Sequence, residues 1–234
     1  MAKKVFISAG HGGSDPGAVA NGFVEKDLNL EISIACRNEL ARHGVTVKMD
    51  RETDVELTMS ETVNMCNSFN PDLAVNIHNN AGGGDGAEVY YSIYGTGKTL
   101  AINILDEMVK IGQNSRGAKT RQGDYGDYYG FIRMTDAPAV IVECAFLDNK
   151  TDVQIIDTPA ERVKMGEAIA RGVLKTLGID YNDDPTPAPS TDPMYRVIVS
   201  EKQRGAFRNL DNALAMAKEY LKNKDDVTIT VRDK

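Results

Sequence analysis

Apolar runs of strand type alternate with segments of helical period through the first 180 residues. The candidate strands are 5–8, 45–49, 73–78, 88–94, 131–134 and 139–143, several of them rich in valine, isoleucine and tyrosine. Helices are expected between them, at about 27–43, after a Thr58 and Glu61 capping pair, at 98–111 and at 159–177. Because strands alternate with helices, the pattern predicts an α/β fold with a twisted, mainly parallel sheet flanked by helices.

A proline-rich stretch interrupts this pattern near residue 182. Residues 182–193 contain four prolines and no apolar residue larger than alanine, so they cannot bury much surface. We therefore expect a domain at 1–180, a linker at 181–193 and a small module at 194–234. In the module, 195–200 and 227–231 alternate as strands and 211–221 has helical period, which predicts a βαβ unit. Such a unit, about 40 residues long, is near the lower limit for independent folding.

Composition excludes several classes of protein. The net charge of −7 argues against a general nucleic-acid binder, although the tail is rich in basic residues. The odd number of cysteines (Cys36, Cys66 and Cys144) and their spacing suggest neither a disulfide framework nor a cysteine zinc site. No segment is long and apolar enough to span a membrane, and the N terminus does not resemble an export signal. We therefore expect the protein to accumulate in the cytoplasm where it is made.

Four polar residues stand where a metal hydrolase needs them. His11 lies in a glycine-rich turn after the first strand, Glu25 opens the first helix, and His78 and Glu143 end two later strands. Sites in parallel sheets collect at the carboxyl ends of the strands, so these residues can meet. Two imidazoles and a carboxylate can hold zinc and leave a position for water. A second carboxylate can then move the protons of an amide hydrolysis.

Each of these residues also has a simpler interpretation. His11 could belong to a phosphate-binding loop, although Gly-His-Gly-Gly lacks the lysine and hydroxyl residue of a P-loop. His78 could be a buried histidine with satisfied hydrogen bonds, and Glu25 could be a partner of the helix dipole. Glu143 is harder to explain this way, because a carboxylate inside an apolar run is costly unless it is paired, metal-bound or protonated.

The motifs that contain these residues carry a family resemblance. Segments 8–18, 25–27, 76–80 and 138–149 resemble the zinc-dependent N-acetylmuramoyl-L-alanine amidases of the type-3 family, within a match over about 3–178. The resemblance implies a six-stranded sheet flanked by helices, and bacterial peptidoglycan as the substrate. It also implies that Zn²⁺ is the cofactor, bound by His11, Glu25 and His78, and that Glu143 is the catalytic carboxylate.

The implied reaction is hydrolysis of the amide between the lactyl group of N-acetylmuramic acid and L-alanine. Glu143 would take a proton from the attacking water and pass it to the departing nitrogen. Asn80, in the 76–80 motif, is a candidate substrate contact. Tyr128 and Tyr129 are further candidates because they lie in an aromatic, glycine-rich loop, although a turn with half-buried tyrosines explains them equally well.

The C-terminal segment suggests a second function. Residues 194–234 resemble half of a sporulation-related peptidoglycan-binding repeat, which implies wall binding, with a homodimer through this segment as the alternative. Two other functions stay open for the whole chain: a zinc peptidase that cleaves the stem peptide, and a non-catalytic wall-binding protein. A wall hydrolase without an export signal fits a bacteriophage endolysin or an enzyme of sporulating cells, and we favour the endolysin.

Overall fold

The computed structural model describes residues 2–183 and, beyond them, 194–199, 202–207, 214, 216–218, 220–221 and 227–232. The chain divides into two compact units, Met1–Asp184 and Pro185–Lys234. Residues 184–193, which make up most of the expected linker, lie outside the described residues. We describe the two units separately.

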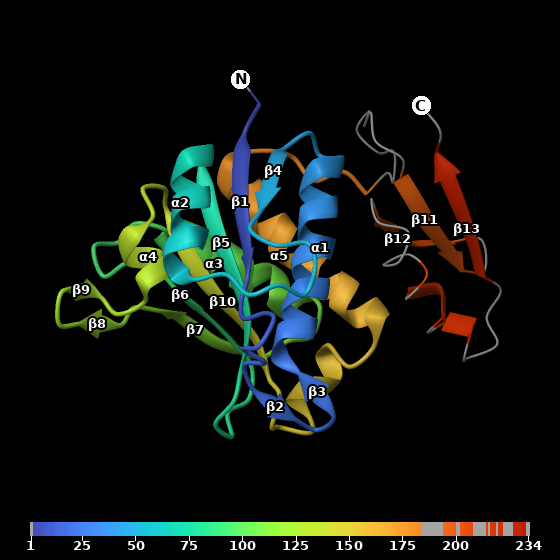
Figure 1. Cartoon of the computed structure of the whole chain (residues 1–234), viewed down its shortest axis with the longest axis horizontal. Helices are drawn as coiled ribbons and strands as arrows, with labels where there is room; N and C mark the ends of the chain where they lie inside the picture. The colour runs from blue at the N-terminus through green and yellow to red at the C-terminus, as the bar shows by residue number, and fades with distance from the viewer. Residues whose placement is uncertain are drawn as a thin grey trace. The chain divides into compact units, whose positions relative to one another are not determined.

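A six-stranded sheet forms the centre of the first unit (Figure 1). Its strands run in the order β4 (Thr46–Met49), β1 (Lys4–Ala9), β5 (Leu73–Asn80), β10 (Ala139–Phe146), β6 (Ala87–Tyr90) and β7 (Ser115–Lys119). All neighbouring pairs are parallel except β10 and β6. The central strands are almost continuously buried, as expected for a parallel sheet covered on both faces. The predicted fold class is confirmed.

Helices cover both faces of this sheet. They are α1 (Glu25–Arg42), α2 (Met59–Phe69), α3 (Lys98–Lys110), α4 (Gly130–Met134) and α5 (Pro159–Leu177), with a short 3₁₀ helix at Asp152–Ile155. α1 and α3 both pack against α5, whereas α2 packs against α4. The capping box predicted at Thr58 and Glu61 begins α2. In the described part of the chain, no helix is long and apolar enough to cross a membrane.

One face of the sheet carries both an apolar core and the candidate site. Beside α2 and α4, Ala74 of β5 and Ala139 of β10 belong to a buried cluster that includes Phe131. His78 and Glu143 follow these alanines by four residues in their own strands. Since alternate strand residues share a face, the two polar residues lie on the same face as the cluster, about 13 Å further along. The site is therefore built on two central, buried strands of the sheet.

In the six-stranded sheet, one predicted strand was wrong and one strand was missed. Residues 131–134 belong to α4, not to a strand. Their burial is grouped in adjacent positions, buried at Phe131 and Ile132 and exposed at Met134, which suits one side of a helical turn rather than alternation. The sixth strand is instead β7, which lies at the edge of the sheet. Its sequence, Ser-Arg-Gly-Ala-Lys, contains no apolar run from which a strand could be predicted.

Two short hairpins shape the loops around the sheet. β2 (Val19–Ala20) and β3 (Phe23–Val24) are joined by Asn21 and Gly22, which both have positive φ, as a tight type I′ turn requires. β8 (Gln122–Gly123) and β9 (Gly126–Asp127) form the second hairpin, within the segment expected to be a flexible loop. The first hairpin leads directly into Glu25 and so fixes where α1 begins.

The second unit contains a three-stranded antiparallel sheet in the order β12 (Lys202–Phe207), β11 (Met194–Val199) and β13 (Val227–Arg232). The described positions between 214 and 221 are helical, whereas 211–213 of the expected helix lie outside the described residues. The predicted βαβ order thus gains an additional strand, β12. Sequence reasoning missed it because Lys-Gln-Arg-Gly-Ala-Phe does not alternate between apolar and polar residues.

Candidate metal centre

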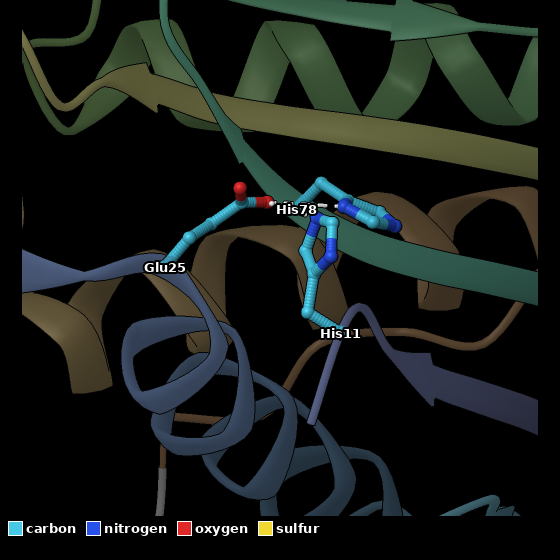
Figure 2. Close-up of side chains that lie close together, drawn as sticks. All are labelled: His11, Glu25 and His78. Atoms are coloured by element: carbon cyan, nitrogen blue, oxygen red, sulfur yellow. Dashed lines mark hydrogen bonds and ion pairs between the residues drawn. The ribbon is translucent and has the colours of Figure 1, made fainter. Parts of the chain in front are cut away.

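His11, Glu25 and His78 converge from three separate elements (Figure 2). One ligand atom from each lies within 4.8 Å of the other two. Oε1 of Glu25 is 3.2 Å from Nε2 of His11 and 3.1 Å from Nδ1 of His78. The two imidazole rings meet edge to face, with centroids 4.9 Å apart. The three residues predicted to hold a metal are therefore brought together.

The donor set and its spacing fit a zinc ion. Zinc takes histidine nitrogens and carboxylate oxygens at about 2.0–2.1 Å, so neighbouring ligands of a tetrahedral ion lie about 3.3 Å apart. The distances from Glu25 to the two histidines are close to that value. Three protein ligands with a fourth position for water are typical of catalytic sites rather than structural ones.

The turn after β1 directs His11 into the cluster. His11 has a φ of 60°, an uncommon conformation for a residue with a side chain, and two glycines follow it. Backbone hydrogen bonds in both directions between Gly12 and Asp15, each 3.0 Å long, close the turn. The Asp15 carboxylate lies 2.7 Å from Nδ1 of His11, on the side of the ring away from Glu25. Metal-binding histidines commonly use this second nitrogen to bond a carboxylate, which fixes the orientation of the ring.

Glu25 is buried at the first position of α1. Its Oε2 accepts a hydrogen bond of 2.8 Å from the Ala18 amide, and its Oε1 accepts one of 3.2 Å from the Asn79 amide. Burial alone would raise the pKa of Glu25, but hydrogen bonds with His11 and His78 hold this pKa well below its usual range. The same contact with Glu25, opposed by burial and helped by Asp15, raises the pKa of His11 to about 9.

Two glycines leave room for the cluster. A Cβ at Gly10 would lie only 2.2 Å from Cε1 of the His78 ring. A Cβ at Gly17, where φ is +63°, would lie 2.5 Å from Oε2 of Glu25 and 2.7 Å from Cδ2 of His11. Any larger side chain at either position would displace a ligand.

Buried polar residues support the turn from behind. Arg51 is 3% exposed and donates hydrogen bonds of 2.9 Å to the carbonyls of Ala9 and Gly10. Asn29 donates to the Gly10 carbonyl and to Oε1 of Glu25, each at 3.1 Å. Sequence reasoning assigned no role to Asp15, Asn29 or Arg51. The role of Asp15 could have been inferred from the sequence, because it follows His11 by four residues in a glycine-rich turn. The roles of Asn29 and Arg51 become visible only in the folded structure.

Glu143 lies beside the cluster in the sheet. It is the register partner of His78 on one side and of Glu88 on the other. Its Oε2 is buried without a hydrogen-bond partner among the described residues. Burial raises the pKa of Glu143 to about 7, with His78 acting against the shift and Glu25 and Glu88 adding to it. A carboxyl group that titrates near neutral pH is suited to accepting and returning a proton.

The three candidate substrate contacts are connected to Glu88 of β6, either directly or through other side chains. Asn80, at the end of β5, donates a hydrogen bond of 3.1 Å to Oε1 of Glu88. The Tyr90 hydroxyl donates to the same oxygen at 3.0 Å, and its ring packs on Tyr129 with centroids 4.9 Å apart. Tyr128 packs edge to face on Tyr129 and is 50% exposed. Asn80 and the tyrosines are thus linked to Glu88, the register partner of Glu143. The sequence analysis did not single out Glu88.

The cysteines and the third histidine have structural surroundings. Cys36, Cys66 and Cys144 are all buried. Burial raises the pKa of the Cys144 thiol well above its usual value, which makes this cysteine a poor nucleophile despite its position next to Glu143. His43 follows the last residue of α1, and its Nδ1 lies 2.9 Å from the Glu39 carbonyl.

Comparison with known proteins gives a consistent result. The family model described as N-acetylmuramoyl-L-alanine amidase matches residues 5–175. The chain is 34% identical over 235 residues to the N-acetylmuramoyl-L-alanine amidase CwlM of Bacillus licheniformis, covering 98% of this chain and 85% of the relative. It is 31% identical over 246 residues to the endolysin of Bacillus phage SPP1, covering 99% of this chain and 88% of the relative.

Solved structures share the fold of the first unit. Cwp6 from Clostridium difficile superposes with a TM-score of 0.74 at 38% identity, over 76% of this chain and 30% of that protein. The N-acetylmuramoyl-L-alanine amidase AmiC2 of Nostoc punctiforme gives a TM-score of 0.69 at 28% identity, over 75% of this chain and 97% of that protein.

Proposed function

Because the chain belongs to the N-acetylmuramoyl-L-alanine amidase family and hydrolyses the amide of bacterial peptidoglycan, we propose that it does so with zinc held by His11, Glu25 and His78. Glu143 is the catalytic carboxylate. The observation that supports these assignments most directly is the buried, unpartnered Oε2 of Glu143 beside three converging metal donors.

The residues divide the reaction between them. When bound, zinc supplies Lewis acidity toward water and toward the lactyl carbonyl oxygen. Glu143 accepts a proton from the attacking water, and its raised pKa lets it return that proton to the departing L-alanine nitrogen. Asp15 holds the ring of His11 through Nδ1, and Asn29 holds the Glu25 carboxylate. The glycan and the stem peptide leave intact.

The test replaces Glu143 by glutamine. Glu143→Gln keeps the shape of the side chain but cannot take a proton, so turnover should fall by about 10²–10⁴-fold while zinc content stays near that of the parent protein. Glu167→Gln is the matched control, because burial also raises the pKa of Glu167 but this residue lies on α5. Near-normal turnover in Glu143→Gln would remove Glu143 from the mechanism.

Product analysis separates the amidase from a peptidase that uses the same zinc ligands. The amidase frees the amino group of L-alanine and keeps muramic acid whole, whereas a stem peptidase frees amino groups further along the peptide. A non-catalytic wall-binding protein would release neither. Digestion of purified walls with and without a chelator, followed by mass spectrometry, distinguishes the three. Activity lost on chelation should return with added zinc.

The second unit is proposed to bind the wall. CwlM of Bacillus licheniformis and the endolysin of Bacillus phage SPP1 align with 98% and 99% of this chain, so both matches extend through the second unit. The full chain should be retained on purified walls more strongly than a chain ending at Asn182. Equal retention, with a dimer seen by sedimentation only for the full chain, would instead favour dimerisation through residues 194–234.

We also propose that the protein acts as a bacteriophage endolysin, accumulating in the host cytoplasm until the membrane is opened. The endolysin of Bacillus phage SPP1 supports this role among the relatives. Expression in a sensitive host should cause lysis only when a pore-forming protein is produced with it. Lysis without such a pore would contradict the proposed route to the wall.

A further inference from the structure

The cross-strand row of ionisable side chains that contains His78 and Glu143 continues across the sheet to two cations, Arg116 and Lys119. Glu88 of β6 faces Glu143 in register and is itself only 4% exposed. Its Oε2 accepts hydrogen bonds from Nε of Arg116, at 2.9 Å, and from Nζ of Lys119. Both cations come from β7, the strand beyond β6. A positive pair therefore lies one strand beyond the catalytic carboxylate and its neighbour.

Glu88 is fully engaged and cannot take part in proton transfer. Besides the two cations, it accepts hydrogen bonds from Asn80 and from the Tyr90 hydroxyl on its other oxygen. These contacts hold the pKa of Glu88 below its usual value although burial opposes them. Its role is therefore to hold the surrounding groups in place rather than to react.

Arg116 keeps part of its binding capacity free. Only Nε is bonded to Glu88, and the guanidinium lies 4.9 Å from the centre of the Phe146 ring. No acceptor among the described residues lies within hydrogen-bond distance of Nη1 or Nη2. The side chain is 37% exposed, and that of Lys119 is 33% exposed. Two cations share one carboxylate, so the group carries a net positive charge and presents oriented, open donors of the kind that bind a carboxylate.

The spacing relates this group to the substrate. Neighbouring strands lie about 4.7–4.9 Å apart, so Glu88 is one strand spacing from Glu143 and the cations lie just beyond it. In a peptide stem, a carboxylate on the second residue lies about 6 Å from the nitrogen of the first, since consecutive Cα atoms are 3.80 Å apart. We propose that Arg116, with Lys119, binds the carboxylate of the second stem residue; this inference rests on the proposed function. The enzyme then prefers a stem peptide whose second carboxylate is free over one in which it is amidated.

The experiment compares two synthetic muramoyl peptides that differ only in that group, one with the second carboxylate free and one with it amidated. The parent protein should cleave the acid with a kcat/KM at least about tenfold higher, the factor expected for a charge-assisted hydrogen bond. Arg116→Gln should lose that preference because its kcat/KM falls for the acid peptide and stays unchanged for the amidated peptide. Arg116→Lys should keep part of it. Lys110→Gln, which removes an ion-paired lysine on α3, is the matched control and should keep all of it.

The outcomes separate this inference from the proposed function. If the parent protein cleaves both peptides equally, or if Arg116→Gln slows both by the same factor, the inference is wrong while the amidase assignment stands. If it cleaves neither, both fail. A second measurement needs no variant: the free stem peptide with the acid should inhibit the parent protein at least about tenfold more strongly than the amidated peptide. Equal inhibition would also overturn the inference.

Discussion

Zinc binding should release a proton from His11, because the pKa of this histidine is raised to about 9 in the metal-free site. The main cause is the hydrogen bond with the ionised Glu25 carboxylate, with burial acting against it and Asp15 adding to it. Zinc binds only the neutral imidazole, so at pH 7 it must displace this proton. Glu25 releases none, since its own pKa is held low and it is already ionised.

The sign and size of the effect follow from this pKa. Below about pH 9 the protonated form of His11 dominates, so zinc affinity should fall by about tenfold for each unit that the pH falls. At pH 7, two units lower, zinc should bind about 100-fold more weakly than on the alkaline plateau. A histidine of ordinary pKa, near 6.5, would lose almost nothing at pH 7.

Titration calorimetry in buffers of different ionisation enthalpy measures the number of protons directly. About one proton or more per zinc is expected at pH 7, since water on the metal can add to the count. His43→Gln is the control, because His43 lies at the end of α1 and should not change this number. A release well below one proton, or an affinity that does not vary between pH 6 and pH 8, would refute the assigned pairing of His11 with Glu25.

Three other changes test the surroundings of the site. Gly10→Ala should lower zinc affinity by about 10- to 100-fold, because its Cβ would overlap the His78 ring. Gly178→Ala is the control, because Gly178 lies at the end of α5 and a Cβ there would meet nothing within 4 Å. Equal zinc affinities for the two variants in a competition assay would contradict this reasoning. Asp15→Asn should also weaken zinc binding, by about 10-fold or more, since the His11 ring loses its charged partner, and unchanged affinity would show that the ring is held without it. Phe131→Ala should lower the free energy of unfolding by about 3–5 kcal/mol, because Phe131 of α4 is fully buried against the sheet. Denaturant titration measures this loss, and a loss under about 1 kcal/mol would mean that the cluster repacks around the smaller side chain.

Hydrophobic periodicity was sufficient to predict most of the fold. The helix at 159–177 has the bounds of α5, and that at 98–111 ends one residue beyond α3. Both carry a continuous apolar stripe, and such a stripe requires burial against another element. The pattern failed at β7, where an exposed edge strand needs no apolar run, and at residues 131–134, where four residues are too few to distinguish a strand from a helical turn.

The metal ligands could be predicted because each is an unusual residue in its place. A histidine among glycines and a glutamate within an apolar strand both need a special reason to be there. Glu88 and Arg116 gave no such signal, because charged residues in short or exposed strands are ordinary. Their relation to Glu143 depends on β6 running antiparallel beside β10, which brings Glu88 opposite Glu143. That pairing is long-range, and no local pattern encodes it.

One cross-strand row therefore orders the chemistry of the site. His78 on β5, Glu143 on β10 and Glu88 on β6 are successive register partners, and Arg116 on β7 bonds the last of them. Since strand spacing is nearly constant, moving one strand across the sheet moves about 4.8 Å along a bound substrate. A metal ligand, a proton carrier and a carboxylate-binding cation then follow in the same order as the carbonyl, the nitrogen and the first side group of a stem peptide. A shift of β6 by one residue would turn Glu88 to the other face and release Arg116, so the antiparallel register of β6 and β10 should control substrate preference while leaving the metal ligands in place.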